Sequence, residues 1–300
     1  DGKQTAITGF GKQNGLDNIP ASAVEKIEII NNPSAKYDAN GNGGIINIIL
    51  KKENQEGFNG KLGLTSGFGS LWKRRENLPN IRPQYKATPK SNPSLSLNYR
   101  KKDVNFFLQA DNLYTETLNR NEFVNRVYSD GTRINQQLKR NRDTNFFTSK
   151  AGLDWFISES NSLTFSGLFS QESIKDRGDQ PFFLENETNG LRLWQFLEDE
   201  VLTAATASIA FEHKFQQPGH KLNAQFNYTF DREDEKYFFT NTNPTFTTYE
   251  SFFLIADQTV ADLSLDYTRP MKHGLVETGF KFRRRTIPTD MQFNPSSTNS

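Results

Sequence analysis

The chain has 300 residues, with 36 Lys and Arg against 35 Asp and Glu, so its formal net charge is only +1. This balance gives no support to a nucleic-acid partner, because such binding depends on clustered basic surface. Cysteine is absent, which excludes disulfide bonds and thiolate metal sites and fits a location outside the cytoplasm. Only 34% of the residues are hydrophobic, yet 26 are Phe and 9 are Tyr, as expected of sheets that are apolar on one face.

The first segment, DNIPASAVEKIEII, covers residues 17–30 and is predicted to form a short helix that leads into a strand. Pro20 suits the first turn of a helix, and the alternating Ile and Glu residues that follow favour a strand. After a polar loop comes IINIIL, which is apolar on both faces except at Asn47 and therefore favours a strand buried on both sides. We expect a small α/β unit over residues 1–53.

Three glycines, Gly41, Gly43 and Gly44, precede IINIIL and raise the question of a nucleotide site. A P-loop needs Lys and then Ser or Thr after its last glycine, whereas Ile45 follows here. The dinucleotide fingerprint needs glycines that open a helix, and these open a strand. We interpret them as residues of a tight turn that requires positive φ.

From Gly57 onward, apolar and polar residues alternate with a period of two, which is typical of half-buried strands. Nine such strands are predicted. They lie within residues 57–69, 94–99, 104–110, 146–157, 163–170, 207–215, 222–231, 261–268 and 276–283.

The connections between these strands alternate in length. Short turns are predicted near residues 100–103, 158–161, 216–219 and 269–273, and long polar loops over residues 70–92, 116–143, 173–201 and 233–255. An outer-membrane barrel has tight periplasmic turns and long external loops, whereas a soluble β-sandwich has no reason to keep this pattern. Strands of about 9–11 residues would cross the membrane. Aromatic residues beside the short turns would form a girdle at the membrane surface: Tyr99, Trp155, Phe156, Phe215 and Tyr267.

The predicted fold is an all-β transmembrane antiparallel up-and-down barrel over residues 54–300, preceded by the carboxyl-terminal part of a small α/β domain. Bacterial barrels have even strand numbers from 8 upward, so nine strands make a partial barrel. The last residues, FRRRTIPTDMQFNPSSTNS, are predicted to begin another external loop. No signal peptide is recognisable at Asp1, and we expect the sequence to be a fragment of a longer chain.

Residues 19–52 resemble the carboxyl-terminal half of the plug domain of TonB-dependent outer-membrane receptors of Gram-negative bacteria. The subgroup most similar is the one whose barrel is described as an outer-membrane β-barrel family. The residues that carry the resemblance are Val24, Glu25, Ile27, Glu28, Pro33, Ser34, Ala35, Tyr37, Gly41, Gly43, Gly44, Ile46 and Asn47.

This resemblance implies a barrel with an occluded lumen. It also implies uptake of a scarce nutrient, such as a metal chelate, cofactor, oligosaccharide or peptide. An inner-membrane complex would supply the energy by pulling on the plug through an amino-terminal segment, the TonB box. That segment, the first half of the plug and more than half of the strands are not in this sequence, so the implied function belongs to the parent protein.

Charged residues on the inner face of the barrel would hold such a plug through hydrated ion pairs, which contribute about 0–1 kcal/mol each. We expect Lys36 and Glu25 of the plug segment to meet inward barrel charges. These inward residues are Lys150, Asp154, Glu212 and Asp266.

No catalytic, cofactor or metal site is predicted, and the chain is not expected to be an enzyme. HExxH and GxSxG motifs are absent from the sequence. The acidic run DREDE, residues 231–235, opens a predicted loop; calcium binding there is the alternative to a solvated charged loop, which we prefer. The three histidines, His213, His220 and His273, are expected to be separate surface residues near turns.

Aromatic residues in the predicted external loops are candidates for a ligand platform, although they could equally pack the loops against one another. They are Phe182, Phe183, Trp194, Phe238, Phe239 and Tyr249, with Phe196, Phe246, Phe252 and Phe253. Two other functions compete with nutrient uptake: a passive pore or adhesin barrel in the outer membrane, and a soluble β-rich binding module. The expected partners are the lipid bilayer, a small-molecule, glycan or peptide ligand, and a TonB-type complex.

Overall fold

The computed structural model describes residues 24–30, 45–50, 56–70, 81–118, 122–185 and 190–296. Every regular element in these ranges is a β-strand. No helix of the described residues is long and apolar enough to cross a membrane. Of the helix predicted ahead of Ile27, the residues before Val24 lie outside the described residues, and residues 24–26 are strand.

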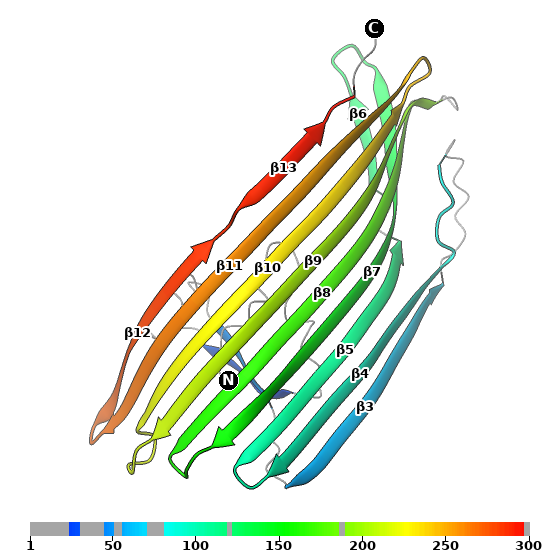
Figure 1. Cartoon of the computed structure of the whole chain (residues 1–300). Helices are drawn as coiled ribbons and strands as arrows, with labels where there is room; N and C mark the ends of the chain where they lie inside the picture. Colours follow the sequence, from blue (N-terminus) through cyan, green and yellow to red (C-terminus); the bar gives the residue numbers. More distant parts are fainter. Residues whose placement is uncertain are drawn as a thin grey trace.

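The strands form two antiparallel sheets (Figure 1). The small sheet consists of β1 (Val24–Ile30) and β2 (Ile45–Leu50). The large sheet consists of β3 (Gly57–Ser70), β4 (Ala87–Lys101), β5 (Val104–Leu118), β6 (Glu122–Val127), β7 (Arg133–Phe156), β8 (Asn161–Leu184), β9 (Gly190–Lys214), β10 (Lys221–Thr242), β11 (Thr247–Met271), β12 (Gly274–Thr286) and β13 (Thr289–Asn294).

In the large sheet, nine strands follow one another in the order β12-β11-β10-β9-β8-β7-β5-β4-β3, with β6 paired to β7 and β13 paired to β11. These nine are the strands predicted from the alternation, so the all-β, antiparallel, up-and-down prediction is confirmed. Within the described residues the path has two ends, β3 and β12.

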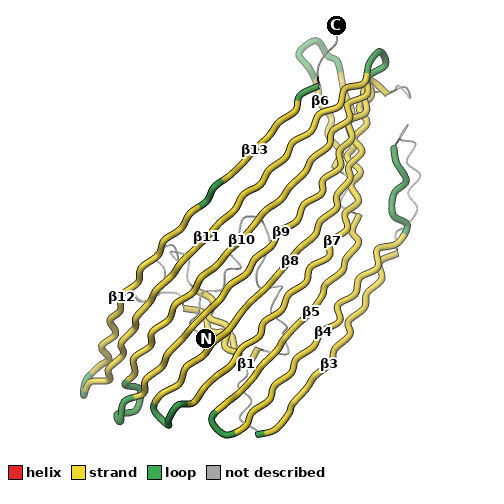
Figure 2. The backbone as a smooth tube through the Cα atoms, in the orientation of Figure 1, coloured by secondary structure: helices red, strands yellow, loops and turns green. Residues whose placement is uncertain are grey.

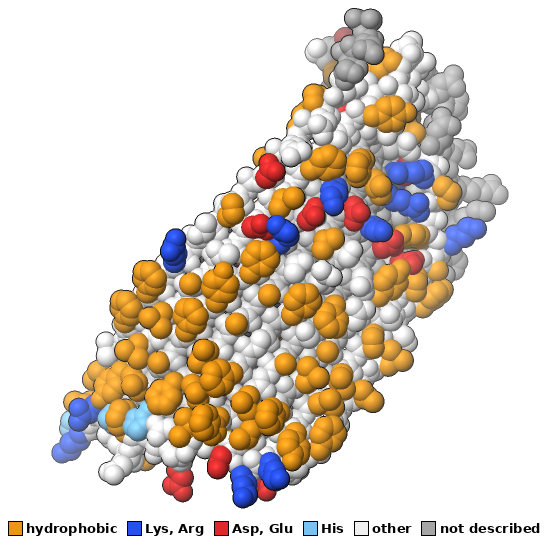
Figure 3. Space-filling view, viewed as in Figure 1, with side chains coloured by type: hydrophobic (Ala, Val, Ile, Leu, Met, Phe, Trp, Pro, Cys, Tyr) orange, Lys and Arg blue, Asp and Glu red, His pale blue; other side chains and the backbone are white. Residues whose placement is uncertain are grey.

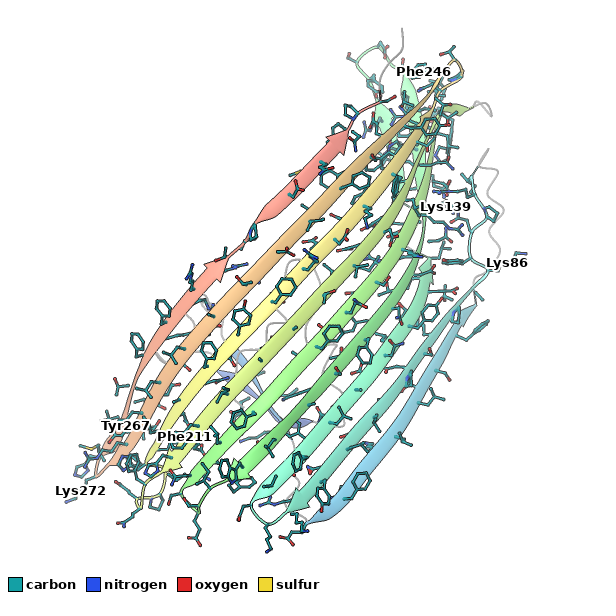
Figure 4. The ribbon with its side chains drawn as sticks, viewed as in Figure 1. Lys86, Lys139, Phe211, Phe246, Tyr267 and Lys272 are labelled. Atoms are coloured by element: carbon teal, nitrogen blue, oxygen red, sulfur yellow. The ribbon has the colours of Figure 1, made fainter. Side chains whose placement is uncertain are left out.

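The four predicted short turns are confirmed, and they all lie at one end of the sheet (Figure 2). Between β9 and β10 the Phe215 amide donates to the His220 carbonyl at 2.9 Å, and Gly219 has a φ of 80°. A residue with a side chain would be strained at that angle, so glycine suits the position. Figure 4 labels Lys272 in the β11–β12 turn at this end and Phe246 between β10 and β11 at the opposite end.

The central strands are much longer than the 9–11 residues predicted from membrane thickness. Strands β7 to β11 contain 22 to 25 residues each. The predicted loops over residues 116–143, 173–201 and 233–255 are therefore wrong in large part, because these residues continue the strands. Strand β10 is paired with β9 and with β11 from Lys221 to Thr242, and a polar sequence does not end a strand whose two neighbours continue beside it.

Two strands were not predicted. Strand β6 forms a hairpin with the start of β7, with Gly131 at a φ of 85° in the turn. Strand β13 pairs with β11 from Ser251 to Ala256, so the loop predicted after β12 is strand as far as Asn294. Only Ile287 and Pro288 separate β12 from β13. Proline lacks the amide that a ladder needs, which accounts for the interruption.

The small sheet confirms the two strands predicted in the plug-like segment. Its register places Ile27 opposite Ile48, Glu28 opposite Asn47 and Ile29 opposite Ile46. The loop motif between the strands (Pro33, Ser34, Ala35, Tyr37, Gly41, Gly43 and Gly44) lies outside the described residues. So do the side chains of β2, on which the prediction of two-sided burial depends.

Candidate functional site

One face of the large sheet is apolar over the half of the strands next to the short turns. We call this surface the apolar band (Figure 3). Its side chains are exposed and share one face by the strand register, as the period-two pattern predicted. The band includes Phe106, Leu108, Phe147, Trp155, Phe165, Phe169, Ile209, Phe226, Tyr228, Leu263, Leu265, Phe280 and Phe282.

The opposite face, which we call the polar face, carries hydrogen-bonded polar side chains. Asn105 donates to one carboxylate oxygen of Asp154 at 3.1 Å, and the Thr164 hydroxyl donates to the other at 2.7 Å. The four predicted inward residues, including Asp154, lie on this face. Their predicted partners in the plug segment are Lys36 and Glu25. The structure describes neither Lys36 nor the side chain of Glu25.

Most of the predicted aromatic girdle lies near the short turns. Tyr99, Trp155 and Phe215 are exposed there. Phe156 is also next to a short turn, but it points to the polar face. Consecutive residues of a strand point to opposite faces, and Trp155 is on the apolar one. The Arg100 guanidinium lies 4.9 Å from the centre of the Phe156 ring on the polar face.

The prediction that the histidines are separate is wrong for two of them. The Phe215 ring stacks on His220 at 3.9 Å and meets His213 edge-on at 4.4 Å, because the β9–β10 turn folds the chain back on itself. His220 Nε2 also lies 2.9 Å from the Tyr267 hydroxyl oxygen. This aromatic cluster occupies the girdle position at the turn end of the sheet (Figure 4).

The far half of the sheet comprises residues 133–145, 170–184, 190–204, 231–242 and 247–258 of β7 to β11, beyond the apolar band. Here five aromatic side chains on the polar face form a cluster that we call the aromatic ladder: Trp194, Phe196, Tyr237, Phe239 and Phe252. Trp194 stacks on Phe239 at 5.7 Å, and Phe239 stacks on Tyr237 at 5.6 Å. The Phe196 ring covers Gly178, where a side chain would collide with it.

The ladder unites only part of the predicted ligand platform. Of the six principal candidates, Trp194 and Phe239 belong to it. Phe238 lies on the opposite face against Phe253, and the Phe182 ring lies under Arg192 at 4.3 Å. All six, including Phe183 and the exposed Tyr249, lie in strands; their assignment to loops is wrong because the strands continue past the apolar band.

Three carboxylates lie beside the ladder on the polar face. One oxygen each of Glu198, Glu200 and Glu235 lies within 4.8 Å of the others. The strand register explains the contact, because Glu200 is directly opposite Glu235 and Glu198 is opposite Tyr237. Two such charges repel by roughly 3 kcal/mol at an effective dielectric constant of about 20. Glu200 lies outside the apolar band. Burial raises the pKa of Glu200 to about 7, and the neighbouring carboxylates of Glu198 and Glu235 contribute to this shift.

Arginines from β7 reach one side of this carboxylate group. Arg140 binds Asp176 at 2.6 Å and approaches Glu198 at 3.4 Å, while Arg142 lies 3.9 Å from Asp176. The Arg140 guanidinium is also 5.5 Å from the centre of the Phe196 ring. The acidic group and the aromatic ladder therefore form one continuous surface.

The sequence analysis missed Glu198, Glu200, Tyr237, Arg140 and Asp176. The available signal was the pair of ExE patterns, at residues 198–200 and 233–235, which a strand places on one face. The composition of the DREDE run predicts a loop, whereas the run is part of β10. Being strand, it divides between the faces, since Arg232 binds Asp257 at 2.7 Å on the apolar side while Asp231 accepts from Gln258 on the polar side. Its five residues therefore cannot bind one ion.

On the other face of the far half, a row of charged side chains borders the apolar band (Figure 3). Asp143, Lys175, Asp199 and Lys236 stand directly opposite one another across β7 to β10, with alternating sign. A row of charges is costly in contact with hydrocarbon, so it marks the limit of the surface that lipid can cover.

The segment before β4 is fixed to this part of the sheet. Arg82 binds the fully buried Asp179 at 2.9 Å and donates to the carbonyls of Gly178 and Phe196 at 2.8 and 3.0 Å. The Tyr85 amide donates to Asn141 at 2.8 Å. These contacts join residues 81–86 to β7, β8 and β9.

Comparison with known proteins gives one match. Residues 213–300, which include β10 to β13, match a family model described as the outer membrane protein beta-barrel family. No curated protein and no solved structure matches the chain. The match, the antiparallel up-and-down strands and the exposed apolar band together support an outer-membrane location and the architecture of an outer-membrane β-barrel.

Proposed function

We propose that this protein is part of an energy-coupled receptor that takes up a scarce nutrient across the outer membrane. The observation that carries the proposal is the segment containing β1 and β2. Its strands hold Val24, Glu25, Ile27, Glu28 and Asn47 of the plug-like motif. A passive pore has no use for an additional domain that leads into its first barrel strand.

The arrangement of the two sheets supports this proposal. Figure 1 draws β1 and β2 behind the large sheet, and Figure 3, in the same view, has the apolar band in front. The small sheet is thus on the side of the polar face. A plug in a water-filled lumen would meet this kind of lining.

The aromatic ladder supports a binding role at the far half of the sheet. Stacked aromatic rings offer flat contact surfaces, and the adjoining carboxylates and Arg140 offer hydrogen-bonding groups. Metal chelates, cofactors, oligosaccharides and peptides all have groups that would fit. The other proposed partners are the lipid bilayer and a TonB-type inner-membrane complex, and we expect neither catalysis nor nucleic-acid binding.

Uptake measured in cells with and without an active energy-coupling complex tests this function. The proposal expects accumulation of one nutrient to stop when the complex is removed, while binding of that nutrient at the cell surface continues. Accumulation that persists without energy coupling would favour a passive pore instead. Surface adhesion without any nutrient uptake would favour an adhesin.

Two neighbouring residues of β10 provide a matched test of the ladder. Phe239→Ala removes a ring from the ladder, whereas Phe238→Ala makes the same change on the opposite face. We expect the first variant to weaken binding of the accumulated nutrient about fivefold, because one stacked ring contributes on the order of 1 kcal/mol. The second should bind normally, and equal binding by the two variants would exclude the ladder as the ligand surface.

A further inference from the structure

We propose that Glu198, Glu200 and Glu235 form a binding site for a divalent cation, with Ca²⁺ as the best-matched ion. The site joins β9 to β10 on the polar face of the far half. It goes beyond nutrient uptake and does not depend on it.

The distances between the three carboxylates suit a shared ion. One oxygen from each lies within 4.8 Å of the other two. Oxygen ligands of Ca²⁺ lie about 2.3–2.6 Å from the ion, so two ligands of one ion are at most about 5 Å apart. The three side chains can therefore reach one ion from the backbone positions that they already occupy.

The state of Glu200 is a second observation that points to a ligand. Its side chain is buried to 9% exposure. Among the described residues, no hydrogen bond or ion pair reaches its carboxylate. Buried carboxylates are normally paired with a cation or coordinate a metal, and this one is directed at two further carboxylates.

The charges around the site also lack compensation. Five carboxylates lie close together on this face: those of Asp176, Glu198, Glu200, Glu233 and Glu235. Among the described residues, Arg140 and Arg142 form ion pairs with this group, both with Asp176 and Arg140 also with Glu198. Neither arginine forms an ion pair with Glu200 or Glu235, and a divalent cation would supply positive charge there.

The ligand chemistry selects the ion. All three ligands are carboxylates, with no histidine or cysteine in the group, which disfavours zinc and other metals that prefer nitrogen or sulfur. Three bidentate glutamates supply six oxygens, within the six to eight that Ca²⁺ takes. Mg²⁺ instead keeps several waters in a strict octahedron, for which a buried group of three large carboxylates is poorly suited.

Bound Ca²⁺ would connect the acidic group to the aromatic ladder. Glu235 and Tyr237 lie two residues apart on the same face of β10, and Glu198 is opposite Tyr237. An ion that fixes both glutamates also fixes the surroundings of this ring. Tyr237 is therefore beside the site and can serve as a built-in donor for luminescence energy transfer.

Terbium luminescence tests the site directly. The complete protein is refolded into detergent without lipopolysaccharide, treated with chelator and titrated with Tb³⁺ while its aromatic residues are excited. We expect a saturable signal that Ca²⁺ displaces, and Glu200→Gln should weaken Tb³⁺ binding at least tenfold. Glu212→Gln makes the same change on the same face of β9, toward the turn end, and should leave binding unchanged.

Thermal unfolding gives a second readout, which keeps the test informative if one of the variants folds poorly. Ca²⁺ should raise the melting temperature of the unaltered protein but not that of Glu200→Gln or Glu235→Gln. A signal that does not saturate, equal binding by Glu200→Gln and Glu212→Gln, or a melting temperature indifferent to Ca²⁺ would overturn the proposal. None of these assays involves nutrient or energy coupling, so their failure would leave the proposed uptake untouched.

Discussion

The two halves of the same long strands differ in what they present to the surroundings. In the half next to the short turns, one face is apolar and exposed, with Ile209 and Phe226 as examples. In the far half, that face carries the alternating charges of Asp143, Lys175, Asp199 and Lys236. The backbone pairing continues unchanged through both halves. Strand pairing is therefore set by the neighbouring strands, while the position of the membrane is set by the outward side chains.

The largest expected difference between the halves comes from placing a charge on the outward face. Ile209→Arg and Leu197→Arg alter two residues of β9 that point the same way and have similar exposure, 44% and 42%. We expect Ile209→Arg to lower the free energy of unfolding by about 2–4 kcal/mol, because the arginine must enter hydrocarbon. Leu197→Arg should cost about 0–1 kcal/mol. Urea unfolding in lipid bilayers measures both.

Equal costs for these two arginines would contradict the division into a membrane half and an aqueous half. Equal and small costs would mean that neither position meets lipid. Equal and large costs would mean that the membrane extends over the charged row.

The next effect compares two arginine–aspartate pairs, one buried and one exposed. Arg82→Ala removes an ion pair from the fully buried Asp179 carboxylate, which should cost about 1–3 kcal/mol. Arg232 is about half exposed and forms two hydrogen bonds with Asp257. Arg232→Ala should destabilise the protein less than Arg82→Ala, because solvent screens an exposed ion pair. Chemical denaturation of the two variants in the same detergent gives the comparison. A larger loss for Arg232→Ala would show that residues 81–86 do not fix the far half.

The sequence predicted the near half well because two constraints act there together. A membrane strand must alternate, and its lipid face must be apolar, so segments such as residues 222–231 are easily recognised. The short turns were recognised for the same reason, as breaks in that alternation. The plug-like motif could be named from the sequence, but its loop lies outside the described residues.

The far half was predicted poorly because only one of these constraints remains. Both faces carry polar as well as apolar side chains there, so residues such as DREDE have the composition of a loop although β9 and β11 continue beside them. Of the aromatic residues predicted to form a ligand platform in this region, Trp194 and Phe239 do meet. The acidic group was missed because its members come from two strands, and the register that aligns Glu200 with Glu235 is a property of the folded sheet.

The most direct test of this account is lipid and water accessibility along one strand. The chain has no cysteine, so single cysteines carrying a spin label can be placed at Phe226, Asn227, Tyr228 and Lys236 of β10. Collision with oxygen should be high at Phe226 and Tyr228, which face lipid. Collision with a water-soluble nickel chelate should be high at Asn227 and Lys236. Labels at Phe226 and Tyr228 that neither reagent reaches would mean a dry interior between two sheets and would contradict the membrane barrel.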